Sequence, residues 1–104
     1  MIRYTVEIAD EALADMEQLY QYIAFNLQSP EYAMGQYNRI ADAILKLDML
    51  PERFRIVDSE PEGSKGIRRM IVDNYSIFYV IQGEKVTVTD VLYSPSDIEK
   101  RLKG

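Results

Sequence analysis

The sequence contains no cysteine, no histidine and no tryptophan among its 104 residues. Without cysteine, the chain has no disulfide framework and no thiolate metal site. Without histidine, it lacks the side chain best suited to acid–base catalysis near neutral pH. A zinc site is also excluded, because the remaining carboxylates suit harder cations. We therefore expect neither a metal nor another cofactor.

Positive charge is scarce as well. The 12 Lys and Arg residues face 17 Asp and Glu, for a net charge of −5. Residues 1–50 hold three basic and eight acidic side chains, whereas residues 51–72 hold five basic and four acidic ones. An acidic chain is a poor general binder of nucleic acid, because affinity for phosphate backbones grows with the phosphates neutralised. The one cationic segment is therefore the natural place to look for a site.

Long apolar runs are missing too. None approaches the length that spans a bilayer, and the opening MIRYTVEIAD alternates polar with apolar residues, unlike a signal peptide. We expect a soluble, cytoplasmic protein without a membrane partner. At this length the chain predicts a single domain over residues 1–104.

The first half of the chain predicts a strand and two helices. Residues 2–8 alternate with period two, which is typical of a strand with one buried face. Asp10 is a candidate N-cap for a helix over residues 11–28, whose apolar side chains recur every three or four positions. Ser29 is a candidate N-cap for a second helix over residues 30–50, which begins with proline. Helices joined this tightly form an antiparallel hairpin.

The second half predicts three strands in sequence. Residues 67–72, 75–81 and 86–93 are rich in β-branched and aromatic side chains. The dipeptide at 73–74 suits a two-residue hairpin turn, and Gly83 supplies the positive φ of the next turn. Consecutive strands joined by such tight turns predict an antiparallel meander.

Two segments flank this meander. Residues 51–65 contain two prolines and a glycine and predict no regular element, whereas residues 95–102 predict a short last helix. The fold class is therefore α+β with the order βααβββα. We expect a four-stranded, mainly antiparallel sheet, packed by the N-terminal helix hairpin and the short C-terminal helix.

The candidate binding residues lie around the cationic segment. Arg53 and Arg55 precede the meander, and Arg68 and Arg69 lie on its first strand. Neighbours on a strand point to opposite faces, so only one of Arg68 and Arg69 can join a given site. Tyr93, at the end of the last strand, is the best-placed hydroxyl. Each arginine also has an ordinary interpretation as a solvated surface charge.

The helix hairpin carries more aromatic and apolar side chains than one buried stripe needs. The surplus consists of Tyr22, Tyr32, Met34 and Tyr37. If they are exposed, they predict a groove for a partner, because contiguous apolar patches mark interaction sites. If they are buried, they only widen the core.

The sequence resembles the RelE/ParE superfamily, the toxins of type II toxin–antitoxin modules, over nearly its whole length. The resemblance is carried, in order, by YIAFNLQSPEYA, LDMLPERFR, GIRRMIVDNYSIFYVI and VTDVLYSPSDIEKRL. It implies a small α+β toxin that is held inactive in a heteromeric complex by a cognate antitoxin.

The superfamily has two activities, and the resemblance implies different residues for each. In the RNA-cleaving, ribosome-dependent mRNA interferases, arginines are common where this chain has Ile71, Ser76 and the turn Ser94-Pro95-Ser96. If this chain cleaves RNA, the catalytic candidates are Arg68, Arg69 and Tyr93, with Arg53 nearby. The ParE branch instead poisons DNA gyrase through protein–protein contact, which needs no acid–base pair.

The composition favours the second activity, because cleavage by the 2′-OH of RNA needs a base, an acid and cations. The partner-binding candidates are then Arg53, Arg55, Arg68, Arg69 and Tyr93. A third alternative is a protein that binds the antitoxin but has lost toxicity.

Overall fold

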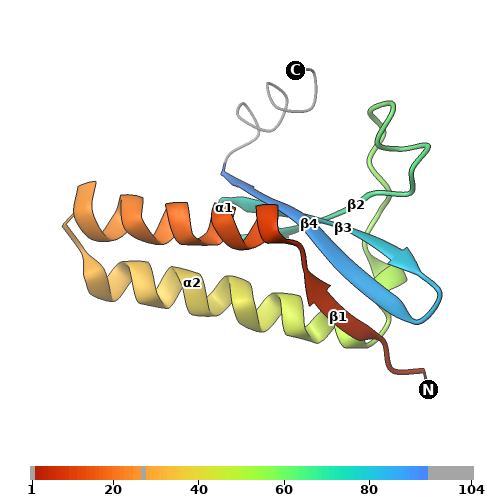
Figure 1. Ribbon diagram of the computed structural model, residues 1–104, viewed down its shortest axis with the longest axis horizontal. Helices are drawn as coiled ribbons and strands as arrows, with labels where there is room; N and C mark the ends of the chain where they lie inside the picture. Colours follow the sequence, from red (N-terminus) through yellow and green to blue (C-terminus); the bar gives the residue numbers. More distant parts are fainter. Residues whose placement is uncertain (1, 27, 94–104) are drawn as a thin grey trace.

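The computed structural model describes residues 2–26 and 28–93 (Figure 1). Its two α-helices are α1 (Asp10–Gln21) and α2 (Pro30–Leu45), and a π-helical turn, Tyr22–Asn26, continues α1. Short 3-10 turns follow at Lys46–Asp48 and Pro51–Arg53. The strands are β1 (Thr5–Ile8), β2 (Arg68–Val72), β3 (Tyr75–Gln82) and β4 (Lys85–Tyr93).

The four strands form one mixed sheet in the order β1-β4-β3-β2. β2, β3 and β4 are the expected antiparallel meander, and β1 joins β4 in parallel at the edge. Val72 pairs with Tyr75, which leaves a two-residue turn in which Asp73 has a φ of 55°. Gly83 has a φ of 62° in the second turn, as the sequence predicts.

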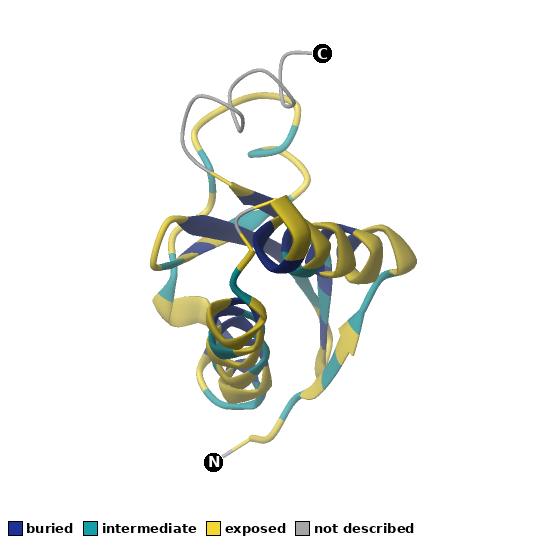
Figure 2. Ribbon diagram, turned by 90° about the vertical axis from the view of Figure 1, so that its left-hand side faces the viewer, coloured by how far each residue is buried: buried dark blue, intermediate teal, exposed yellow. Residues whose placement is uncertain are grey.

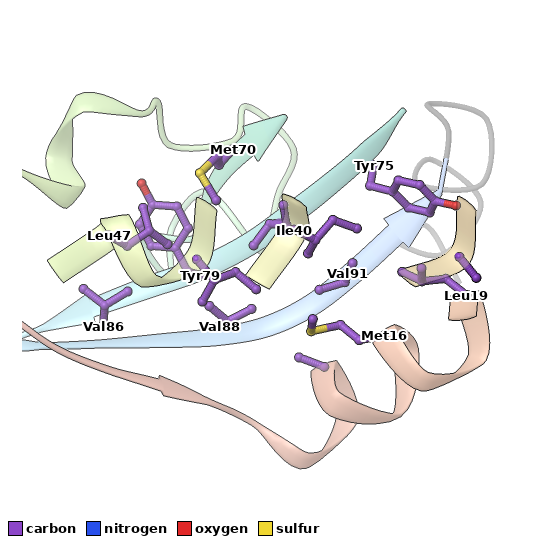
Figure 3. Packing of buried hydrophobic residues seen from close by; sticks show 14 of the residues in the cluster. Met16, Leu19, Ile40, Leu47, Met70, Tyr75, Tyr79, Val86, Val88 and Val91 are labelled. Atoms are coloured by element: carbon purple, nitrogen blue, oxygen red, sulfur yellow. The ribbon is translucent and has the colours of Figure 1, made fainter. Parts of the chain in front are cut away.

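Helices α1 and α2 run antiparallel and cover one face of the sheet, with their buried sides turned toward it (Figures 1 and 2). Figure 3 shows the core between these layers, with Tyr79, Leu47 and Met70 at one end and Met16 and Leu19 at the other. Full burial of each such side chain stabilises the fold by about 1.5–3 kcal/mol. The predicted α+β class and the packing of the hairpin on the sheet are confirmed.

The element boundaries differ from the expectation in several places. β1 begins only at Thr5. The N-cap of α1 is Ala9, not Asp10 as predicted. Asp10 lies in the first turn of α1, where its negative charge interacts favourably with the helix dipole. Ser29 is the N-cap of α2, although its side chain makes no capping hydrogen bond. The segment predicted as irregular contains the 3-10 turn Pro51–Arg53, since proline suits a first helical position. The predicted helix over residues 95–102 lies outside the described residues.

A β-bulge in the last hairpin sets the orientation of the end of β4. Phe78 pairs with Asp90 but Tyr79 pairs with Val88, so Thr89 is the extra residue. Its Oγ1 donates a hydrogen bond to the carbonyl of Phe78 at 3.3 Å. The bulge shifts the alternation by one residue. As a result Val88 and Val91 both face the helices, although they are three positions apart.

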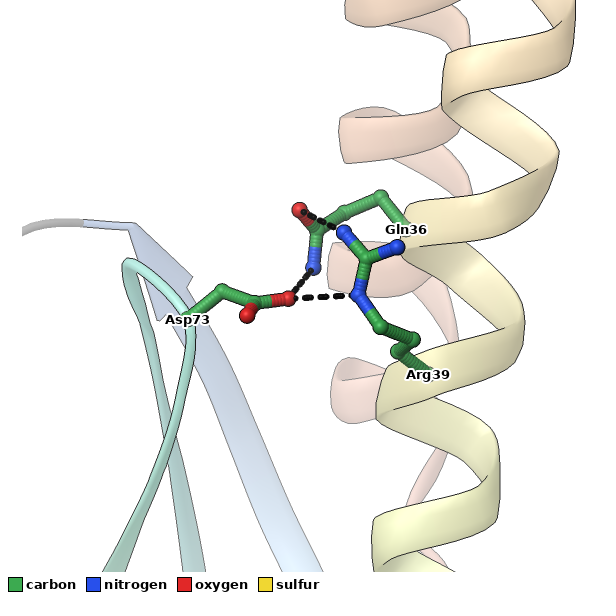
Figure 4. Close-up of polar contacts among 3 residues, drawn as sticks. All are labelled: Gln36, Arg39 and Asp73. Carbon is green, nitrogen blue, oxygen red and sulfur yellow. Dashed lines mark hydrogen bonds and ion pairs between the residues drawn. The ribbon is translucent and has the colours of Figure 1, made fainter.

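A polar clamp joins helix α2 to the turn between β2 and β3 (Figure 4). Asp73 Oδ2 accepts hydrogen bonds from Gln36 Nε2 at 2.9 Å and from Arg39 Nε at 2.8 Å. Arg39 also donates to the amide oxygen of Gln36 at 3.2 Å. Hydrogen bonds from the Arg39 and then the Gln36 side chains lower the pKa of Asp73 below its usual 3.8. The clamp ties the helical layer to the end of the sheet.

We expect Asp73→Asn to lower the melting temperature at pH 7, because asparagine tolerates the positive φ but removes the charge from the clamp. The folded-state pKa is depressed, so the carboxylate stabilises the fold fully above pH 3.8 and less as the pH falls through the folded value. The deficit of the variant should therefore shrink on acidification. Thermal scans from pH 7 to pH 3 measure this, with Asp58→Asn at an exposed loop position as the control. Equal melting temperatures at pH 7 would contradict the role of the clamp.

Candidate functional site

The chain reverses direction after α2 in a turn that two side chains from the sheet, those of Tyr79 and Arg68, fasten to the body of the protein. Leu50 has a φ of 50°, a left-handed conformation in which a side chain is strained. The buried Tyr79 hydroxyl donates to the carbonyl of Pro51 at 2.6 Å. The Arg68 guanidinium donates to the carbonyls of Glu52 at 3.1 Å and Phe54 at 2.6 Å. Two neighbouring predicted site residues therefore differ in their environment. Arg68 is half-buried and hydrogen-bonded to the turn, whereas Arg69 is exposed.

The Arg53 side chain forms hydrogen bonds within the same turn. Its Nη1 donates to the carbonyls of Met49 at 2.6 Å and Leu50 at 2.9 Å. Its guanidinium also lies over the Phe54 ring, 4.7 Å from the ring centroid. These contacts satisfy part of its donor capacity and hold the strained Leu50 in place. A partner that bound Arg53 would have to share it with the turn.

Two phenols border this turn. Tyr4 donates a hydrogen bond to Glu52 Oε1 at 2.5 Å, which raises the pKa of Tyr4 and lowers that of Glu52. Burial raises the pKa of Tyr79 to about 12. Both phenols are therefore neutral donors at neutral pH and cannot serve as bases. Both hydroxyls therefore serve to hold the turn in place.

Arg55 and Arg69 lie next to each other on the face of the sheet opposite the helices, which we call the outer face. Residues 55–57 run antiparallel to the start of β2: Arg69 N–H donates to the Arg55 carbonyl at 3.2 Å, and Val57 N–H to that of Ile67 at 2.9 Å. Val57 and Ile67 pack against the outer-face residue Phe78. Side chains two positions apart share a face, so Arg55 and Arg69 also lie there.

This pair is unusual because like charges opposite each other on a sheet are destabilising. Both side chains are exposed, and among the residues that the structure describes neither forms an ion pair. Ile71, two positions along β2 from Arg69, is 62% exposed on the same face. The two guanidiniums beside an exposed apolar side chain form a surface suited to an anionic or mixed partner, and we call these three residues the arginine patch.

Tyr93 lies elsewhere. Its ring packs against Tyr75 with a centroid distance of 5.1 Å, on the side of the sheet that the helices cover. Tyr79 is on that side too, whereas Arg69 pairs with Phe78 on the outer face. The structure therefore separates Tyr93 from the arginine patch by the thickness of the sheet. Among the described strands, no tyrosine side chain shares a face with Arg69.

The sequence missed two features of this arrangement. It gave no signal that Arg55 and Arg69 are cross-strand neighbours, because nothing predicted that residues 55–57 pair with β2. It also did not reveal that Arg68 holds backbone carbonyls. The proline after Leu50 and the arginine two residues later mark a tight turn, but only the pairing shows which side chains meet there.

Within residues 2–26 and 28–93, no group of three or more metal-ligating side chains could hold an ion. The same part of the chain has no helix that is both long and apolar enough to cross a membrane.

The chain matches, over residues 6–97, the family of ParE toxins of type II toxin–antitoxin systems, parDE. The match spans most of the chain, so the protein belongs to this family and is a type II toxin of the RelE/ParE superfamily. A comparison with curated protein sequences finds no match.

Solved structures share the fold. A chain of the chromosomal ParDE toxin–antitoxin system from P. aeruginosa superposes with a TM-score of 0.76 at 16% identity, covering 88% of this chain and 97% of the other. A chain of the RelBE2 toxin–antitoxin complex from Mycobacterium tuberculosis gives 0.59 at 21% identity, covering 89% and 93%. At these identities the likeness establishes the common fold.

Proposed function

We propose that this toxin is neutralised by a cognate antitoxin and acts by protein–protein contact, as a poison of DNA gyrase that binds through the arginine patch. The observation that carries the proposal is the pairing of Arg55 with Arg69 on an exposed face, next to Ile71. Arginine beside an apolar side chain is typical of residues that dominate protein interfaces. The solved structures of similar fold are toxin–antitoxin systems, which supports an antitoxin partner.

The chemistry of the patch favours contact over cleavage. Strand scission by the 2′-OH needs a proton acceptor and a proton donor within hydrogen-bond reach of the phosphate. Tyr93 lies across the sheet from the patch, and Tyr79 is buried with a pKa of about 12. Arginine remains protonated at any physiological pH and is a poor proton acceptor. The two arginines supply charge, and none of the described tyrosines supplies an acid or a base on their face of the sheet.

Ribosome-dependent mRNA cleavage is the second candidate, because a pair of guanidiniums can hold an RNA phosphate. In that case Arg69 and Arg55 would bind the phosphate, whereas Arg68, also predicted as catalytic, would act through the turn that it holds. The net charge of −5 disfavours long contact with RNA but does not prevent one phosphate from binding.

One induction experiment separates these functions. The toxin is expressed from a controlled promoter, with the antitoxin from the adjacent reading frame under a second one. We expect growth arrest that the antitoxin relieves, chromosomal breaks that depend on gyrase, and loss of supercoiling by purified gyrase with added toxin. Primer extension on cellular transcripts should show no new cuts. Cuts within codons, with intact gyrase activity, would instead establish the mRNA interferase, and harmless expression would indicate a binding protein that has lost toxicity.

A further inference from the structure

A groove of about 820 Å³ opens at the end of the molecule where α1 passes into its π-helical turn and α2 begins. The start of β3 and the end of β4 form its other wall. Four tyrosines line it, Tyr22, Tyr32, Tyr75 and Tyr93, together with the apolar Leu19. Figure 3 shows Tyr75 and Leu19 at this end of the core. The groove lies on the opposite side of the sheet from the arginine patch.

Three of the four tyrosines in this groove are exposed. Tyr22, Tyr32 and Tyr93 are 57%, 54% and 52% exposed, and only Tyr75 is buried. The four tyrosines line the same space. Burial raises the pKa of Tyr75, and the neighbouring Tyr93, Tyr32, Asp73 and Tyr22 raise it further. Of the aromatic surplus on the hairpin, Tyr22 and Tyr32 thus belong to a groove, whereas Tyr37 is half-buried against Tyr20.

Among the described residues, the helical wall of the groove carries acidic side chains and no basic ones. Residues 10–38, which supply its helical wall, contain five acidic side chains and no lysine or arginine. One of these acids, Asp15, lines the groove and accepts a hydrogen bond from Val91 N–H at 3.0 Å. The next base in the sequence, Arg39, also interacts with the Tyr32 hydroxyl, and its charge is balanced by the ion pair with Asp73. Acidic surroundings and the negative faces of tyrosine rings both attract a cation.

We propose that this groove receives a lysine or arginine side chain from a basic segment of a protein partner. The cation would lie over the rings of Tyr22 and Tyr32, and the apolar part of the segment would pack on Leu19 and Ile23. The identity of the partner rests on the proposed function, which makes it the cognate antitoxin. The preference of the groove for a basic side chain does not depend on that function. An acidic segment would be repelled by the same surroundings that attract a basic one.

Binding of the antitoxin to the full chain tests the groove through matched variants. Tyr22→Leu and Tyr32→Leu remove a ring and should each weaken binding about 5- to 30-fold. Tyr22→Phe and Tyr32→Phe keep the ring and should bind nearly as the parent does. Phe25→Leu is the control, because Phe25 is 73% exposed in the same π-helical turn but does not line the groove. Binding should also weaken as salt is raised.

A second measurement does not depend on the antitoxin. Aromatic NMR spectra of the full chain are recorded with N-acetyl-arginine methyl amide at millimolar concentration, and with the glutamine analogue as the uncharged control. The arginine fragment should shift the resonances of Tyr22, Tyr32 and Tyr93, and the glutamine fragment should not. If neither fragment shifts them, or both do so equally, the cation site is wrong.

The two measurements also separate this inference from the proposed function. An antitoxin that binds tightly but is insensitive to both Tyr→Leu variants leaves the toxin function intact and overturns the groove as its docking site. An antitoxin that fails to bind at all overturns the proposed partner. The fragment spectra then show by themselves whether the groove binds a cation.

Discussion

Alanine at Tyr79 is expected to lower the free energy of unfolding by about 3–5 kcal/mol, the cost of removing a fully buried aromatic ring. The side chain of Tyr79 has no exposed surface and lies in the main core with Leu47 and Met70 (Figure 3). Domains of this size have a total stability of only about 5–15 kcal/mol. The variant should therefore be partly unfolded at physiological temperature.

The hydroxyl accounts for a separate part of this loss. Tyr79→Phe keeps the ring but leaves the Pro51 carbonyl without its donor, at a cost of about 1–3 kcal/mol. Urea unfolding of the parent and both variants gives these differences. Tyr37→Phe is the control, because the Tyr37 hydroxyl forms no hydrogen bond within residues 2–26 and 28–93 and its ring stays against Tyr20. If Tyr79→Phe unfolds at the same urea concentration as the parent, the hydroxyl does not fasten the turn.

Glutamine at Arg55 or at Arg69 is expected to reduce toxicity sharply while the fold stays intact. An arginine at the centre of an interface contributes about 2 kcal/mol or more, which is about 30-fold in affinity. The two like charges repel each other across the strands, so either change should leave the melting temperature equal or raise it slightly. Loss of function without loss of stability separates a binding role from a structural one.

Colony counts after induction and the affinity for purified gyrase measure this effect, and the double variant should be non-toxic. Arg3→Gln is the control, because it removes an exposed positive charge that is paired with Asp48 away from the patch. Arg68→Gln should behave differently from the patch variants and from Arg3→Gln. It leaves the carbonyls of Glu52 and Phe54 without their hydrogen-bond donor and should lower the melting temperature. Full toxicity of the double variant would exclude the arginine patch as the target-binding surface.

The turns and the alternation of strands could be predicted because they depend on neighbouring residues. Gly83 and Asp73 adopt the positive φ values that their residue types allow, and Tyr75 and Tyr79 share a face as the period of two requires. The candidate site was predicted only as a set of residues. Arg55 and Arg69 were both in that set, but so were Arg53 and Arg68, whose guanidiniums fasten a turn.

The sequence by itself determined the order of the elements from β1 to β4, the α+β class and the absence of thiol and imidazole chemistry. These follow from local periodicity, turn residues and composition, which do not depend on contacts between distant parts of the chain. The family was indicated by the resemblance of four sequence segments and confirmed by the family match. The tertiary structure alone decided that Arg55 lies opposite Arg69, that Val91 turns inward after the bulge at Thr89, and that four tyrosines from separate elements border one groove. Each depends on backbone pairing or packing between segments far apart in sequence, where a shift of one residue turns a side chain to the other face.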